Sequence, residues 1–145
     1  MTVSERIYVR RSWALLSALR RALRTERNVR FAMLFGSAAT GASSTRSDVD
    51  ILVDLRDPRL ESVVDLQGRL SAAVGRPVHI VRLRDAEVDP AFRGEVVRDG
   101  RVLVDRAGLW PRLCRREARS RRRVDAERAQ RLDRALAGID RLLAG

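Results

Sequence analysis

The chain has 145 residues, of which 45% are hydrophobic, enough for one domain with a core of its own. Its 30 basic residues are all arginine and exceed the 19 acidic residues, so the formal net charge is +11. Such an excess attracts nucleic acid, nucleotides or an acidic protein. The single cysteine, Cys114, excludes an intramolecular disulfide. Because no apolar run approaches the ~18 residues of a membrane span, we expect a cytoplasmic protein without membrane contact.

Residues 4–27 begin the chain with a mixture of arginines and apolar side chains. From Trp13 onward the apolar residues recur at helical spacing, through Leu16, Leu19 and Leu23. The spacing predicts an amphipathic helix. We expect Trp13 to pack this helix against a sheet, since a large aromatic side chain contributes most to such contacts.

Residues 29–35 form an apolar and aromatic run, typical of a strand buried on both faces. Gly36 then permits a sharp turn and lets a ligand approach the backbone, because glycine has no Cβ. Ser37 can cap a following helix, whose free N–H groups would face an anion such as a triphosphate. The segment therefore predicts a phosphate-facing turn.

A second apolar run, residues 49–53, carries two carboxylates at its start. Asp48 and Asp50 are two positions apart, so on a strand they share a face. Two carboxylates so close repel each other unless a cation lies between them. Mg²⁺ is the expected cation, because it takes hard oxygen ligands and completes its octahedron with waters and substrate phosphates.

Each of these pieces alone has an ordinary explanation. Gly36 and Ser37 occur in many strand-to-helix turns, and Asp48 and Asp50 could be a solvated entry to a strand. The combination of strand, Gly-Ser, ten-residue spacer, Asp-x-Asp and second strand favours a nucleotide site.

The same combination resembles the signature of the minimal nucleotidyltransferases of the DNA polymerase β superfamily, over about residues 10–105. The resemblance implies an α/β (α+β) fold with a mixed sheet and helices packed mainly on one face. In that family the positions of Asp48 and Asp50 hold two Mg²⁺ ions, which carry the triphosphate of ATP or another nucleotide. They also prepare an acceptor hydroxyl for attack on the α-phosphate.

The later elements of the resemblance are a helix at residues 60–74, a strand at 77–83 and a closing segment at 92–104. On the strand, the family has a third carboxylate, which binds metal and activates the acceptor; the aligned residue here is His79. An imidazole can accept a proton near neutral pH, but it is a poor ligand for Mg²⁺. His79 is thus either a substitute base or the mark of a degenerate site, and both interpretations stay open.

The turn after Ser37 departs from the family as well, which often carries arginines there to hold the triphosphate. This chain has Ala38-Ala39-Thr40-Gly41, and Arg46 is the candidate substitute. The predicted site residues are Asp48, Asp50 and His79 for catalysis, Asp48 and Asp50 for metal, and Gly36, Ser37 and Arg46 for the nucleotide.

Residues 107–145 are predicted to be an arginine-rich helical extension of a nucleotidyltransferase domain at residues 1–106. One long helix, or two with a break, should begin near Pro111. Arginines crowd residues 112–123, as a solvated face or as a nucleic-acid contact. An apolar seam follows at Val124, Leu132, Leu136, Ile139 and Leu143. This seam needs a partner, which could be its own domain, a second copy or another protein.

Within the superfamily, the chain resembles the stand-alone antitoxins of HEPN/MNT toxin–antitoxin pairs. That resemblance implies transfer of AMP from ATP to a tyrosine hydroxyl of a HEPN toxin, in a homo- or hetero-oligomer. One alternative, favoured by His79, is an antitoxin with weak or lost chemistry that neutralises its partner by binding. Another is a transferase that modifies a small drug molecule.

Overall fold

The computed structural model describes residues 3–41, 48–86 and 89–145, with side chains described from Trp13 onward. Its elements in chain order are α1 (Val3–Leu23), β1 (Val29–Phe35), α2 (Ser37–Thr40), β2 (Val49–Leu55), α3 (Leu60–Val74), β3 (Val78–Arg82), α4 (Leu83–Ala86), α5 (Pro90–Asp99), β4 (Arg101–Asp105) and α6 (Leu109–Ala144). Residues 1–110 and 111–145 form two compact units. The predicted domain boundary after residue 106 stays a prediction.

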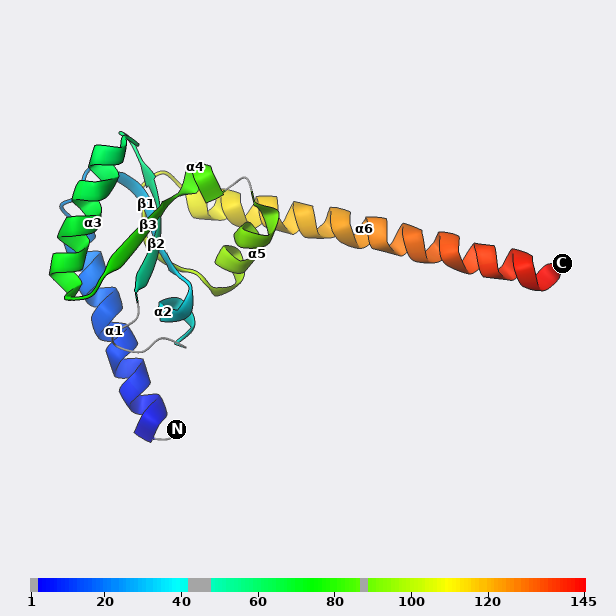
Figure 1. Ribbon diagram of the computed structural model, residues 1–145, viewed down its shortest axis with the longest axis horizontal. Coiled ribbons are helices and arrows are strands. Elements are labelled where there is room, and N and C mark those ends of the chain that lie inside the picture. The colour runs from blue at the N-terminus through cyan, green and yellow to red at the C-terminus, as the bar shows by residue number, and fades with distance from the viewer. Residues whose placement is uncertain (1–2, 42–47, 87–88) are drawn as a thin grey trace. The chain divides into compact units, whose positions relative to one another are not determined.

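The first unit is built on one mixed four-stranded sheet with the order β3-β2-β1-β4 (Figure 1). The central strand β1 runs antiparallel to β2 and β4, whereas β2 and β3 are parallel. A parallel pair needs a crossover connection, which α3 supplies. The predicted mixed sheet is confirmed.

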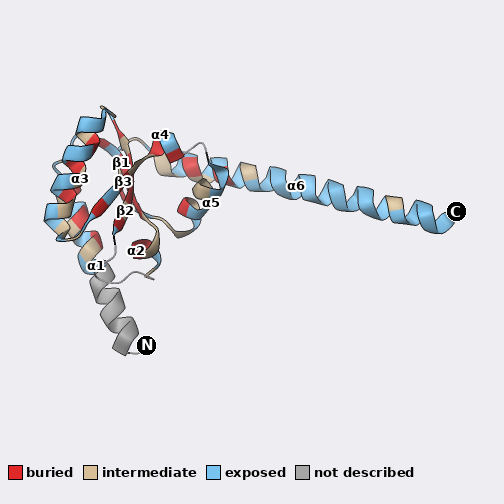
Figure 2. Ribbon diagram, viewed as in Figure 1, coloured by how far each residue is buried: buried red, intermediate tan, exposed pale blue. Residues whose placement is uncertain are grey.

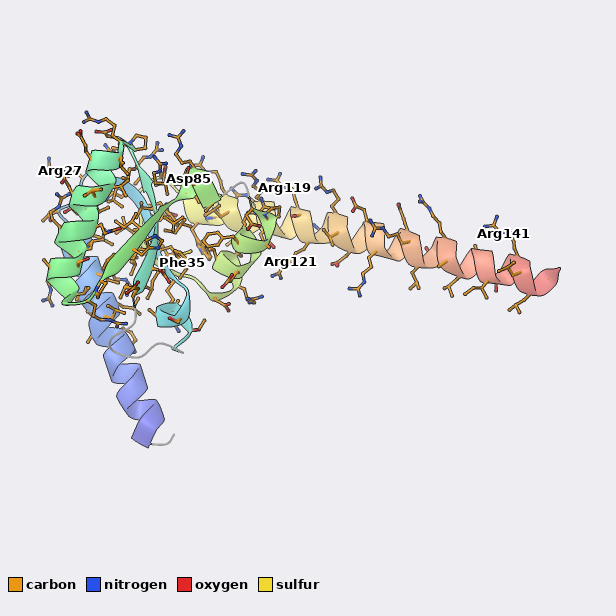
Figure 3. All side chains as sticks on the ribbon, viewed as in Figure 1. Arg27, Phe35, Asp85, Arg119, Arg121 and Arg141 are labelled. Atoms are coloured by element: carbon orange, nitrogen blue, oxygen red, sulfur yellow. The ribbon has the colours of Figure 1, made fainter. Side chains whose placement is uncertain are left out.

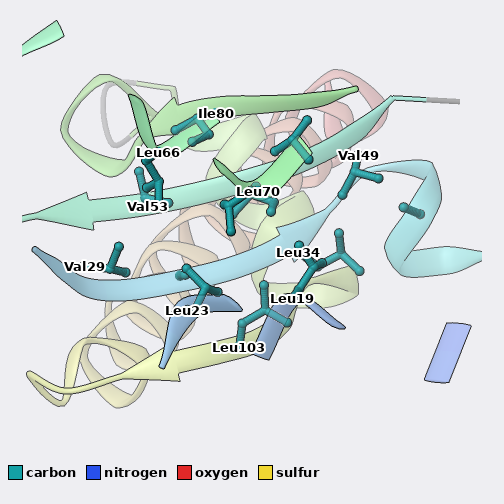
Figure 4. Packing of buried hydrophobic residues seen from close by; sticks show 14 of the residues in the cluster. Leu19, Leu23, Val29, Leu34, Val49, Val53, Leu66, Leu70, Ile80 and Leu103 are labelled. Atoms are coloured by element: carbon teal, nitrogen blue, oxygen red, sulfur yellow. The ribbon is translucent and has the colours of Figure 1, made fainter. Parts of the chain in front are cut away.

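Helices α1 and α3 contact each other and cover one face of the sheet (Figure 1). Between them and the strands lies the apolar core, and Figure 2 shows the buried residues concentrated there. Side chains that alternate along the strands supply one side of this core, because successive residues point to opposite faces. Its members include Leu19, Leu23, Leu34, Val49, Val53, Leu66, Leu70 and Ile80 (Figure 4). The opposite face of the sheet is left for other groups.

Trp13 does not pack α1 against the sheet, so this prediction is wrong. Its side chain is 62% exposed, whereas Leu19 and Leu23 are fully buried. The apolar positions from Leu16 onward already define the buried face of the helix. Trp13 falls outside that stripe.

Arg106 holds the connection from the end of α1 to the start of β1. Its guanidinium donates hydrogen bonds to the carbonyls of Leu23, Arg24, Glu26 and Val29, at 2.6–3.3 Å. Leu23 is the last residue of α1 and Val29 is the first residue of β1, and a cation at the C-terminal end of a helix also complements the helix dipole. One side chain after the last strand therefore fastens the first helix to the central strand.

Asp105, the neighbour of Arg106, caps the start of α6. Its carboxylate accepts hydrogen bonds from the backbone N–H groups of Leu109 (2.9 Å) and Trp110 (3.0 Å). Burial raises the pKa of Asp105, but backbone N–H groups, among them those of Trp110 and Leu109, outweigh burial and hold that pKa below its ordinary value. The charged form is thus the one that the fold stabilises.

The second unit consists of residues from Pro111 onward in α6. The 36-residue helix is continuous, which settles the choice between one helix and two. The apolar seam is exposed, since Val124, Leu132, Leu136, Ile139 and Leu143 are 51–80% accessible. Arginines project along the helix, including the labelled Arg119, Arg121 and Arg141 (Figure 3). Within the described residues, no helix combines the length and apolar content needed to cross a membrane.

Candidate functional site

The turn after β1 is built around Gly36, whose φ of 71° and ψ of −157° suit glycine alone. Gly36 stands at the N-cap position of the short helix α2, and Ser37 is the first helical residue. No side chain caps the helix. The prediction that Ser37 caps it is wrong, because the positive φ needed at the turn assigns the capping position to glycine.

Asp50 leans over this turn. A Cβ atom added to Gly36 would stand 2.7 Å from Asp50 Oδ2, closer than any real contact of that kind. A side chain at position 36 would therefore strain the backbone and also displace the Asp50 carboxylate. The predicted nucleotide-binding turn and the predicted metal ligand are in contact.

Asp50 also lies between two residues of the neighbouring strands. In the sheet register it pairs with Phe35 of β1 on one side and with His79 of β3 on the other. The Nδ1 atom of His79 is 3.5 Å from Asp50 Oδ1. Val78 and Ile80 are buried in the core while His79 is exposed, which confirms the predicted alternation. The structure thus joins Gly36, Asp50 and His79 on the sheet face away from α1 and α3.

Asp48 directly precedes β2 and is exposed. Over the described part of the chain, no three side chains of histidine, cysteine, aspartate or glutamate gather into a ready-made metal cage. Mg²⁺ usually binds through only one or two carboxylates, together with substrate phosphates and waters. The carboxylates of Asp48 and Asp50 fit that kind of site. Arg46, the predicted phosphate ligand, lies outside the described residues.

Two further side chains border the site and were not predicted. Phe92 of α5 meets Phe35 edge-on, with ring centroids 5.1 Å apart and planes at 83° (Figure 3 labels Phe35). Arg101 of β4 donates from Nε to the carbonyl oxygen of Ala39 in α2, at 3.0 Å. Phe92 and Arg101 therefore brace the Gly36 turn from the side of the closing segment.

The predicted closing segment is divided into α5 and β4. The start of α5 could have been predicted from the sequence, since Asp89-Pro90 combines a capping residue with proline in the first turn. The Asp89 carboxylate accepts hydrogen bonds from the N–H groups of Ala91 (2.9 Å) and Phe92 (3.4 Å). This cap fixes the start of the helix that presents Phe92.

A cavity of about 310 Å³ lies elsewhere in the first unit, lined by residues that include Leu55, Asp57 and Arg69. Leu55 is at the far end of β2 from Asp50, roughly 17 Å away at 3.3 Å per residue. The cavity is therefore separate from the residues discussed above.

The family described as polymerase beta nucleotidyltransferase matches residues 18–108. Comparison with curated proteins gives no match. Among solved structures, a toxin–antitoxin pair with AMP-PNP contains a chain with 24% identity and a TM-score of 0.60, covering 83% of this chain and 98% of that one. A structure of a tri-AMPylated Shewanella oneidensis HEPN toxin in complex with MNT antitoxin contains a chain with 21% identity and a TM-score of 0.57, covering 86% of this chain and 98% of that one. The structure of the MntA-HepT toxin–antitoxin contains a chain with 21% identity and a TM-score of 0.55, with the same two coverages of 86% and 98%.

These structural similarities, at under 25% identity, establish the fold. The family match covers more than half of the chain and includes the Gly36 turn, Asp48, Asp50 and His79. The chain therefore belongs to the polymerase beta nucleotidyltransferase family.

Proposed function

We propose that this protein transfers a nucleoside monophosphate, AMP from ATP, to a hydroxyl group of a partner protein, as the antitoxin of a HEPN/MNT pair. The observation that carries the proposal is the contact between the Gly36 turn and the Asp50 carboxylate. It brings a backbone that can face phosphates next to a side chain that can hold the cation those phosphates require.

Each predicted residue has a role in this proposal. The N–H groups at Gly36 and Ser37 face the β- and γ-phosphates, with Arg46 as a further phosphate ligand. Asp48 and Asp50 hold divalent metal, two ions in the full proposal. Bound metal would stabilise the charge that develops on the transferred phosphoryl group. Two alternatives remain for His79: it accepts the proton of the acceptor hydroxyl, or it has no role in catalysis.

A protein acceptor suits the shape of the site. His79 is exposed, with 63% of its side chain accessible, and the 310 Å³ cavity is away from it. The solved structures most relevant here are complexes of a HEPN toxin with an MNT antitoxin. The exposed apolar seam of α6 offers a surface for such a partner, whereas contact of its arginine cluster with nucleic acid stays a prediction.

The test is a transfer assay on the purified, tag-free chain with the HEPN protein encoded beside it. Each α-³²P-labelled nucleoside triphosphate is added in parallel buffers with Mg²⁺, Mn²⁺ or Zn²⁺. We expect label on the partner with the unaltered chain and none with the Asp48→Ala, Asp50→Ala double variant. Asp54→Asn is the matched control, because Asp54 is on the same face of β2 but pairs with Arg30 at 2.7 Å.

Absence of label under every metal, with a stable neutralising complex still formed, would overturn the transfer proposal. The result would establish the second candidate function, a binding antitoxin, which the replacement of a carboxylate by His79 favours. Label on an aminoglycoside-like hydroxyl compound, and none on the protein, would instead identify a transferase for small molecules.

A further inference from the structure

Asp50 and His79 form a pair whose separation is unusual for a direct hydrogen bond. They are register partners on the parallel strands β2 and β3, and Nδ1 of His79 is 3.5 Å from Asp50 Oδ1. A charge-assisted N–H···O⁻ bond would be shorter, about 2.7–2.9 Å. The two strands therefore place the nitrogen and the oxygen near each other but beyond the length of that bond.

That separation matches the spacing of two ligands on one metal ion. Zn²⁺ binds histidine nitrogen and carboxylate oxygen at about 2.1 Å, usually with tetrahedral angles. Two donors at that distance and angle are roughly 3.4 Å apart. The observed distance of 3.5 Å between Nδ1 and Oδ1 is thus almost the distance expected between two ligand atoms of a single ion, so the side chains would move little on binding it.

The donor chemistry points the same way. A histidine in place of a carboxylate removes one negative charge and exchanges a hard oxygen for an imidazole nitrogen. Imidazole suits zinc and other first-row transition metals, whereas Mg²⁺ prefers oxygen and binds nitrogen poorly. The second oxygen of Asp50, Oδ2, faces the Gly36 turn, so Oδ1 is the atom directed to His79.

We propose that His79 Nδ1 and Asp50 Oδ1 together bind one transition-metal dication of the Zn²⁺ class in preference to Mg²⁺. The remaining ligands of this ion are nucleotide phosphates and water, and Asp48 keeps its role at the second ion of the proposed function. Metal on Nδ1 requires the tautomer that carries its proton on Nε2. His79 bound in this way is a metal ligand and not the base. The inference rests on the proposed function, because it concerns the metal of the same site.

The test uses the fact that His79 is the only histidine of the chain. Tag-free protein labelled with ¹⁵N at histidine alone gives imidazole resonances that all belong to residue 79. With a non-hydrolysable ATP analogue present, we expect one equivalent of Zn²⁺ to shift the Nδ1 resonance far more than the Nε2 resonance. An excess of Mg²⁺ should neither cause nor reverse that shift.

Two variants make the result decisive. Asp50→Asn should abolish the Zn²⁺ shift if both residues share the ion, and Asp54→Asn on the same strand should leave it unchanged. Calorimetric Kd values for both metals give the second measurement. The preference for Zn²⁺ over Mg²⁺ should fall about 10-fold or more in His79→Asp, the scale on which ligand-shell changes alter metal affinity.

The proposal is overturned if Zn²⁺ leaves Nδ1 unshifted, if Asp50→Asn shifts like the unaltered chain, or if His79→Asp keeps the same metal preference. These readouts do not involve nucleotide transfer. A chain that binds Zn²⁺ through His79 but labels no partner contradicts only the proposed function. A chain that labels its partner with Mg²⁺ and shows no Nδ1 shift contradicts only the present inference.

Discussion

The carboxylate of Asp50 lies so close to the α-carbon of Gly36 that a Cβ at position 36 would stand 2.7 Å from Asp50 Oδ2. The turn that ends β1 and the carboxylate near the start of β2 therefore occupy one shared space. Neither can change without moving the other, although 14 positions separate them in the sequence.

Gly36→Ala should abolish nucleotide transfer and also destabilise the fold. The new methyl group must displace the Asp50 carboxylate, and a positive φ costs a non-glycine residue about 1–2 kcal/mol. Gly75→Ala is the matched control, since Gly75 has a φ of +66° but a Cβ there would meet no atom within 4 Å. Both variants should lose stability in urea denaturation, Gly36→Ala the more, because the φ/ψ of Gly36 is closed to other residues whereas that of Gly75 is left-handed helical, and only Gly36→Ala should lose transfer. Equal activity in the two variants would contradict the shared-space argument.

Arg106→Ala should lower the free energy of unfolding by about 2 kcal/mol, because hydrogen bonds to a charged group contribute roughly 1.5–3 kcal/mol. The four carbonyls between the last residue of α1 and the first residue of β1 would lose their common donor. Arg106→Lys should recover only part of the loss, since an ammonium cannot reproduce the planar fork of a guanidinium. Urea denaturation followed by circular dichroism checks both variants, and a change under about 0.5 kcal/mol for Arg106→Ala would refute the assigned role.

Asp105→Asn should reduce stability at pH 7 by about 1 kcal/mol, the scale of a charge at a helix N-terminus. The amide keeps an acceptor oxygen but loses the charge. Because the folded-state pKa of Asp105 is lowered, its contribution is complete above the unfolded-state pKa and is lost as pH falls through the folded-state value. The difference between the two proteins should therefore shrink below about pH 4. A difference that stayed constant from pH 7 to pH 2 would show that the charge is not responsible.

The local elements were the most predictable part of this fold. The strand at 29–35 and the helix at 60–74 occur with the predicted bounds, because the strand is a nearly unbroken apolar run and the helix repeats its apolar residues at the helical period. The strand predicted at 77–83 is slightly shorter, Val78–Arg82, and its alternation correctly left His79 outside the core. The family membership and the mixed sheet were implied by the resemblance that Gly36-Ser37 and Asp48-Val49-Asp50 carry, and both are confirmed.

What failed depended on contacts between distant segments. Trp13 fitted the apolar stripe of α1 by type, but its position on the helix faces outward. Ser37 looked like a cap until the turn placed Gly36 at that position. The contact of Phe92 with Phe35 and the bond from Arg106 to Leu23 of α1 depend on how strands are brought together, which local periodicity does not encode.

The double change Leu136→Asp, Ile139→Asp should leave the stability of the first unit unchanged and abolish binding of the HEPN partner. Both side chains are more than half exposed, so replacing them removes little buried apolar surface from the first unit. Two charges in the apolar seam would oppose docking, because a docked partner would bury them without a counter-charge. Arg134→Ala, Arg141→Ala on the same helix is the control for charge. Size-exclusion chromatography with the partner checks the complex, and undiminished binding would exclude the seam as the docking surface.

The four carbonyl bonds of Arg106 also bear on the order in which the chain folds. Arg106 follows the residues that it bonds by 77–83 positions, so the connection from α1 to β1 has no donor from Arg106 until all four strands of the sheet have been synthesised. Long-range closure of this kind raises contact order and slows folding. The connection between α1 and β1 is thus among the last parts of the first unit to gain its hydrogen bonds, and the apolar face of α1 must wait for the sheet that covers it.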